Sequence, residues 1–204
     1  METLVQVFYD LCTSLMIPTM AALLLFLGWA MVQFGQFARE NFDRSGGHRL
    51  FRAAIEQLKA GDHAPADVRS RLSELRPVEG PVGAFVAKSR ASDPLVLSKI
   101  LDDVQIALNS RAAKVAVGIR IGPMLGLMGT LIPMGPALTG LASGNVADLA
   151  RNLVVAFTTT VIGLIIGGIC YFIQLSRRRW YVQDLSDLDF IHDLIVRGPV
   201  KEAP

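Results

Sequence analysis

Charged residues are almost absent from two stretches of this 204-residue sequence. Only two charges lie between Arg120 and Arg177, and the stretch 11–38 has none. An α-helix needs roughly 20 apolar residues to cross a bilayer. The stretch between the two arginines is long enough for two crossings joined by a loop, and 11–38 is long enough for one. The sequence therefore predicts an all-α membrane protein with three transmembrane helices.

Residues that enzymes and metal sites require are also scarce. The two cysteines lie in or beside different apolar stretches and the three histidines are scattered, so we expect neither a disulfide nor a metal site. No glycine-rich phosphate loop followed by lysine is present. A formal net charge of +2 gives no case for nucleic-acid binding. We expect no enzymatic activity and no cofactor.

Positive charge is unevenly distributed along the chain. Every lysine and arginine except Arg151 lies in 39–120 or after Ser176, and the first ten residues have none. Because lysine and arginine are retained on the cytoplasmic side of a membrane, this distribution places the N-terminus outside and the C-terminus in the cytoplasm. The N-terminus has no positive region before its apolar run and no clear cleavage site, so we interpret it as retained.

Four segments follow from this topology. Residues 1–38 form an N-terminal segment with the first transmembrane helix, and residues 39–114 form a cytoplasmic helical region. Residues 115–176 form a transmembrane hairpin of the second and third spans, which we expect to form the pore. Residues 177–204 form a cytoplasmic C-terminal helix and tail. The fold is thus three spans with long cytoplasmic helical extensions.

Helical patterns dominate the region 39–114, where strand alternation is absent. Helices are predicted at 48–60, 65–75 and 82–90. Asp93 followed by Pro94 resembles an N-cap with proline at the first helical position. The helix that begins there is predicted to continue into the second span. Its apolar residues recur at helical spacing and include Leu97, Val104 and Leu108. One helix cannot bury this apolar stripe alone, which argues for a partner helix or a neighbouring subunit.

The residues after the third span also have helical periodicity. One face is apolar and consists of Tyr181, Leu185, Leu188, Ile191 and Ile195. Asp184 and Asp187 are expected on other faces. We favour a cytoplasmic helix packed against the soluble segment or a copy of itself, because anionic lipid would repel the aspartates of a helix lying on the membrane.

Small residues recur every fourth position in the second span of the hairpin and at spacings of four, three and four in the third. The second span has Gly118, Gly122, Gly126 and Thr130, and the third has Ala156, Thr160, Gly163 and Gly167. Such stripes let another helix approach closely. On the residues alone, tight helix packing is the favoured interpretation.

Hydroxyl residues at the depth of the spans suggest a second interpretation. A threonine inside a membrane either bonds to its own helix or faces a polar interior. Thr158, Thr159 and Thr160 are consecutive and cannot all face one way, and we place Thr160 inward because it lies on the small-residue stripe. No threonine holds a proton at physiological pH. A path lined by Thr130 and Thr160 therefore needs an ionisable group from another chain.

The loop between the two spans carries both of the hairpin's charged residues. Asn145 is a suitable N-cap for the third span, and Asp148 lies near the positive end of that helix. We favour this capping role, with an ion pair between Asp148 and Arg151, over a role of these charges in ion entry.

Three blocks of the hairpin together resemble the ExbB/TolQ/MotA proton-channel family. They are GPMLGLMGT at 122–130, SGNVADLA at 143–150 and AFTTTVIGL at 156–164. The resemblance covers residues from about 93 to 190, whereas 39–92 match only in topology and character. Three spans and an external N-terminus are closer to the ExbB/TolQ branch than to the four-span MotA branch.

The resemblance implies a homo-oligomer, a pentamer, in the inner cell membrane. Its second and third spans would surround a pore that holds the membrane helix of an ExbD/TolR/MotB-like single-span partner, and an aspartate of that partner would carry the proton. Thr130 and Thr160 match the family's two pore-facing threonines. The helix-packing residues of this pore bundle would be Gly122, Gly126, Ala156, Gly163 and Gly167.

One departure from the family pattern concerns the ion. Where ExbB-like proteins often carry a glutamate before the third-span threonine, this chain has Val155, with Asn152 one turn away. Proton and sodium therefore both stay open. The resemblance implies a channel-forming subunit of a membrane motor driven by an ion gradient, as in protein transport. The alternative is a non-conducting scaffold that assembles a single-span partner. A small-molecule transporter is disfavoured, because internal repeats and a pair of broken helices are absent.

Overall fold

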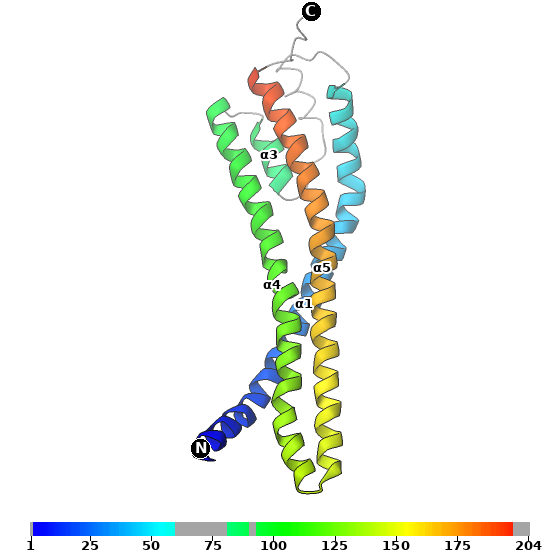
Figure 1. Ribbon diagram of the computed structural model, residues 1–204. Coiled ribbons are helices and arrows are strands. Elements are labelled where there is room, and N and C mark those ends of the chain that lie inside the picture. The colour runs from blue at the N-terminus through cyan, green and yellow to red at the C-terminus, as the bar shows by residue number, and fades with distance from the viewer. Residues whose placement is uncertain (1, 60–80, 90–92, 198–204) are drawn as a thin grey trace, which may run out of the picture. The chain divides into compact units, whose positions relative to one another are not determined.

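The computed structural model describes residues 2–59, 81–89 and 93–197, and every regular element in these ranges is an α-helix (Figure 1). The elements are α1 (Glu2–Lys59), α3 (Pro81–Ser89), α4 (Pro94–Ala142) and α5 (Val146–Arg197). The helix predicted at 65–75 lies outside the described residues. The prediction of an all-α fold is confirmed for the part of the chain that the structure describes.

Three of these helices are long and apolar enough to cross a membrane. The candidate spans are Tyr9–Phe42 in α1, Leu95–Ala142 in α4 and Val146–Val196 in α5. They correspond to the three spans that the sequence predicts. Four prolines lie inside the long helices, at Pro18, Pro123, Pro133 and Pro136. Proline removes a helical hydrogen bond, and transmembrane helices tolerate this where neighbouring groups satisfy the freed carbonyl.

Helix boundaries agree with the sequence at two places and differ at one. The predicted helix at 82–90 corresponds to α3. Asp93 precedes α4 as predicted, its carbonyl oxygen accepts a bond from the Leu97 amide at 2.9 Å, and α4 continues without a break into the second span. In contrast, α1 is one helix through residues 38–47, where the sequence analysis ended the first span and began another helix. Two glycines at 46 and 47 are not enough to end it.

The loop between α4 and α5 is very short and consists of residues 143–145. Gly144 has φ +83°, a left-handed conformation that glycine adopts without strain. Its amide donates to the Leu141 carbonyl at 3.0 Å, and the Asn145 amide donates to the Gly140 carbonyl at 2.8 Å. These two bonds form a Schellman motif that ends α4. The Asn145 side chain then accepts the Asp148 amide at 3.3 Å, which caps α5 as predicted.

The chain divides into two compact units. The span unit comprises Met1–Gln36 and Lys114–Gln174, and the extension unit comprises Phe37–Ala113 and Leu175–Pro204. Each long helix contributes to both units. The span unit contains the α4–α5 hairpin and the first part of α1, whereas the extension unit has a hydrophobic core of its own.

The core of the extension unit is formed by side chains from α1, α3, α4 and α5. Its buried members include Ile55, Leu58, Phe85, Val86, Leu97, Val104, Leu108, Tyr181, Leu188, Ile191 and Ile195. The members from α4 and α5 belong to the apolar faces that the sequence predicts for α4 and for the C-terminal helix. The stripe of α4, which one helix cannot bury, is therefore covered within the same chain.

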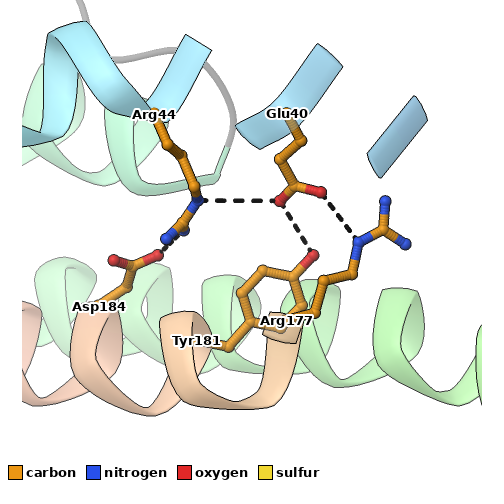
Figure 2. A network of polar contacts seen from close by, with 5 residues as sticks. All are labelled: Glu40, Arg44, Arg177, Tyr181 and Asp184. Carbon is orange, nitrogen blue, oxygen red and sulfur yellow. Dashed lines mark hydrogen bonds and ion pairs between the residues drawn. The ribbon is translucent and has the colours of Figure 1, made fainter. Parts of the chain in front are cut away.

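A polar network links α1 and α5 inside this unit (Figure 2). The Arg177 Nε donates to Glu40 at 2.9 Å, and the Tyr181 hydroxyl donates to the same carboxylate at 3.3 Å. Arg44 forms an ion pair with Asp184. Arg44 also lies over the Trp180 ring, with its guanidinium carbon 4.9 Å from the ring centroid. Two arginines and two carboxylates balance each other, as buried charges require.

The positions of two aspartates on α5 correct the sequence analysis. Asp184 is 4% exposed and Asp187 is 8% exposed, although both were expected on faces other than the buried apolar one. Asp184 lies three residues after Tyr181 and four before Leu188, so helical geometry places it on the same face as these core residues. Its charge is tolerated there because Arg44 compensates it.

Removing the charge of Asp184 is expected to destabilise the extension unit. Asp184→Asn removes the nearer carboxylate from Arg44 and leaves it only Glu40, 4.0 Å from its Nε, and breaking a buried pair costs about 3 kcal/mol. The double variant Arg44→Met, Asp184→Leu is expected to be more stable than Asp184→Leu alone. Thermal unfolding of the purified protein measures both. Asp189→Asn, at an exposed position of the same helix, is the control, and a loss equal to that of Asp184→Asn would contradict the assignment.

Candidate functional site

The contact between α4 and α5 in the span unit is made by glycine backbones. A Cβ atom placed on Gly163 would lie 2.7 Å from the Gly122 carbonyl oxygen and 2.7 Å from the Gly126 Cα. One on Gly126 would lie 3.1 Å from the Gly163 Cα. Real Cβ atoms essentially never approach backbone within 3.0 Å, so only glycine fits at 163, and a Cβ at 126 would force its neighbours to shift. The two small-residue stripes thus face each other within one chain, and their packing against other copies stays a prediction.

Two further glycines, Gly167 and Gly118, also bring neighbouring helices close together. A Cβ on Gly167 would meet the Pro123 ring at 3.0 Å and the Ile119 carbonyl oxygen at 3.6 Å. Pro123 has no amide hydrogen, so the Ile119 carbonyl loses its usual helical partner. A Cβ on Gly118 would lie 2.3 Å from the Cys170 Sγ and 2.9 Å from Trp29 of α1. This last contact brings α1 against the hairpin.

Four threonines near the glycine contact, Thr130, Thr158, Thr159 and Thr160, occupy different environments. Thr159 is 6% exposed and packs on Gly129, where a Cβ would lie 2.6 Å from its hydroxyl oxygen. Thr160 is half-buried beside Gly126, and Thr130 is partly exposed one turn along α4 from that glycine. Thr158 is exposed. The sequence analysis missed Thr159, whose contact with Gly129 joins two different helices.

Every one of these threonine hydroxyls donates to its own helix. Thr130 bonds to the Leu127 carbonyl at 2.7 Å and Thr158 to the Val154 carbonyl at 2.7 Å. Thr159 and Thr160 both bond to the Ala156 carbonyl, at 2.9 and 3.2 Å. Ala156 itself is buried. The hydroxyls are thereby satisfied without a partner chain, while their lone pairs remain able to accept hydrogen bonds.

Within the described α4–α5 hairpin, no charged residue lies close to these threonines along either helix. The two charged residues of the hairpin, Asp148 and Arg151, lie at the start of α5. Asp148 accepts a hydrogen bond from the Asn145 side chain. The predicted ion pair of Asp148 with Arg151 is wrong, because the carboxylate contacts the capping residue instead. The side-chain amide of Asn152 also forms a local hydrogen bond, which it donates to the Asp148 backbone carbonyl at 3.0 Å.

Gly163→Ala is expected to destabilise the hairpin. The added methyl would meet backbone atoms, which cannot rotate away, and overpacking of this kind costs about 1–3 kcal/mol. Gly168→Ala is the matched control, because a Cβ at Gly168 has no atom within 4 Å. Its higher helix propensity is expected to leave stability unchanged or slightly raised. Thermal unfolding in detergent measures both, and equal melting temperatures for the two variants would contradict the contact.

Comparison with known proteins supports the same interpretation of the hairpin. The MotA/TolQ/ExbB proton channel family model matches residues 78–187, which is more than half of the chain. The match includes α3, all of α4 and most of α5. A search of curated proteins returned no match. The three apolar helices and the family match agree that this is a membrane protein, and the chain belongs to the MotA/TolQ/ExbB proton channel family.

Proposed function

We propose that this protein is the channel-forming subunit of a membrane motor driven by an ion gradient. In this proposal a pentamer surrounds the membrane helices of an ExbD/TolR/MotB-like partner, and proton or sodium flow is coupled to mechanical work or transport. One observation supports this proposal most strongly. The hairpin matches the proton channel family and carries threonine hydroxyls along its spans, but it has no ionisable side chain beside those threonines. The matching family consists of channels and not of enzymes, which agrees with such a hairpin.

The missing ionisable group argues for a partner. Each charge that crosses the membrane releases about 2.3 kcal/mol per 100 mV, and a carrier within the bilayer must bind and release the ion to use that energy. Thr130 and Thr160 can accept hydrogen bonds from water or from a protonated carboxyl group, but they cannot carry a proton themselves. An aspartate on the partner's membrane helix supplies that chemistry. Val155 adds no carboxylate from this chain.

The exposed surface of the hairpin is consistent with assembly in a bilayer. The outward side chains of α4 include Met124, Leu127 and Leu131, and those of α5 include Val154, Phe157 and Leu164. Lipid tails or the spans of other subunits suit such apolar faces. We propose the orientation that the charge distribution favours, with the N-terminus outside and residues 39–114 and 177–204 in the cytoplasm of an inner-membrane protein.

Ion flux in vesicles tests the proposed motor. Vesicles that contain this protein together with its single-span partner are expected to take up protons or sodium along an imposed gradient. Replacing the partner's membrane aspartate with asparagine is expected to abolish the uptake, because the carrier is lost. The ion is identified by a pH-sensitive dye and by a sodium-sensitive dye. No flux in any combination would instead establish a non-conducting scaffold that assembles the partner.

Thr160→Val tests the residue that we place in the pathway. Valine keeps the shape of threonine and removes the hydroxyl, so flux is expected to fall about fivefold, as for the loss of one hydrogen bond near 1 kcal/mol. Thr158→Val removes a hydroxyl from a neighbouring, exposed position and is the control. If Thr158→Val abolishes flux while Thr160→Val conducts normally at equal expression, the pore-facing assignment is wrong.

A further inference from the structure

The Arg177 side chain is fixed by a hydrogen bond from its Nε to Glu40, and its two terminal nitrogens take no part in this bond. Its side chain is 8% exposed, and its Nε donates to Glu40 at 2.9 Å. The Tyr181 hydroxyl bonds to the same carboxylate and fixes its orientation. In Figure 2 only the Nε of Arg177 is joined to Glu40, and no dashed line reaches its two terminal nitrogens. Within the described part of the chain, no hydrogen bond is found for these two nitrogens.

A guanidinium fixed through Nε presents its remaining N–H groups as a fork. Such a fork matches the oxygens of a phosphate group, which it binds through two parallel hydrogen bonds. Holding an arginine in advance also lowers the entropy cost of binding, since the side chain loses little further freedom. Arg177 is therefore prepared to bind an anion on the side that faces away from Glu40.

The surroundings of Arg177 on α5 indicate where that anion resides. Tyr171, Phe172 and Leu175 precede it on the same helix and are 59%, 56% and 43% exposed. Arg178 and Arg179 follow it and are exposed. An apolar, outward-facing helix that changes abruptly to arginine marks the level of the lipid headgroups. A phosphate at this level belongs to a lipid.

We propose that Arg177 and Arg178 bind the phosphate of an anionic phospholipid headgroup, with Arg179 adding positive charge. Arg177 supplies the fixed fork, and Arg178 supplies a second guanidinium from the adjacent, exposed position. The negative charge of the lipid offsets this run of positive charge, in which only Arg177 has a carboxylate partner among the residues that the structure describes. The proposal requires that α5 crosses the bilayer, but not that the protein conducts an ion, so it can fail independently of the proposed function.

Lipid titration of the full-length protein in detergent tests the proposal. Short-chain phosphatidylglycerol is expected to bind more tightly than phosphatidylcholine of the same chain length. Arg177→Lys keeps a positive charge for Glu40 but removes the fork, so the affinity for phosphatidylglycerol is expected to fall about tenfold while that for phosphatidylcholine stays the same. Native mass spectrometry counts the bound lipids.

Two further measurements keep the proposal falsifiable. Arg178→Gln changes an exposed side chain and is expected to weaken phosphatidylglycerol binding without unfolding the protein. Lys99→Gln, which removes a positive charge from a 67% exposed side chain, is the control. If Arg178→Gln and Lys99→Gln bind phosphatidylglycerol equally, the proposal is overturned. It is also overturned if inorganic phosphate binds as tightly as the lipid, because the site would then serve a soluble anion.

Discussion

The close approach of the α4 and α5 backbones is the contact on which the rest of the span unit depends. Helices inside a membrane gain little from the hydrophobic effect when they meet, because lipid is as apolar as their side chains. Attraction must instead come from dense van der Waals contact, which requires short distances. Gly122, Gly126 and Gly163 provide them. This contact fixes the rotation of both helices, and so determines that Thr159 is buried while Thr160 and Thr130 remain accessible.

The extension unit is stabilised by different physics. Its core is a continuous apolar cluster of the kind found in water-soluble helical domains. Beside that cluster, Glu40, Arg44, Arg177 and Asp184 form a network of balanced charge. Buried ion pairs contribute little net stability, but a mismatched pairing leaves a charge uncompensated and is costly. We therefore interpret the network as a device that selects one alignment of α1 against α5.

Local patterns in the sequence predicted most of the helical structure. The spacing of Leu97, Val104 and Leu108 indicated the buried face of α4, and Asp93 with Pro94 indicated its start. What the sequence did not predict depends on residues far apart in the chain. The burial of Asp184 requires Arg44, which is 140 positions away. A pattern that assigns charge to the outside cannot anticipate such a partner.

The candidate site shows the same division between local and distant information. The glycine stripes predicted that a helix approaches closely, since spacing determines which small residues share a face. The stripes do not specify whose helix approaches, and the structure shows that α4 and α5 of one chain supply both sides. Thr159 was missed because its contact with Gly129 depends on the rotation of α5 against α4. A repeat of four within one helix contains no information on that rotation.

Asn145 ends one helix and begins the next, and this double role has a mechanical consequence. Its amide closes the last turn of α4 and its side chain closes the first turn of α5. No slack remains between the two helices, so neither can slide or twist without breaking a hydrogen bond at the loop. Torque applied to one helix is transmitted to the other at once. In the motor that we propose, rotation would therefore occur at the surface between this chain and neighbouring subunits, and not within the hairpin.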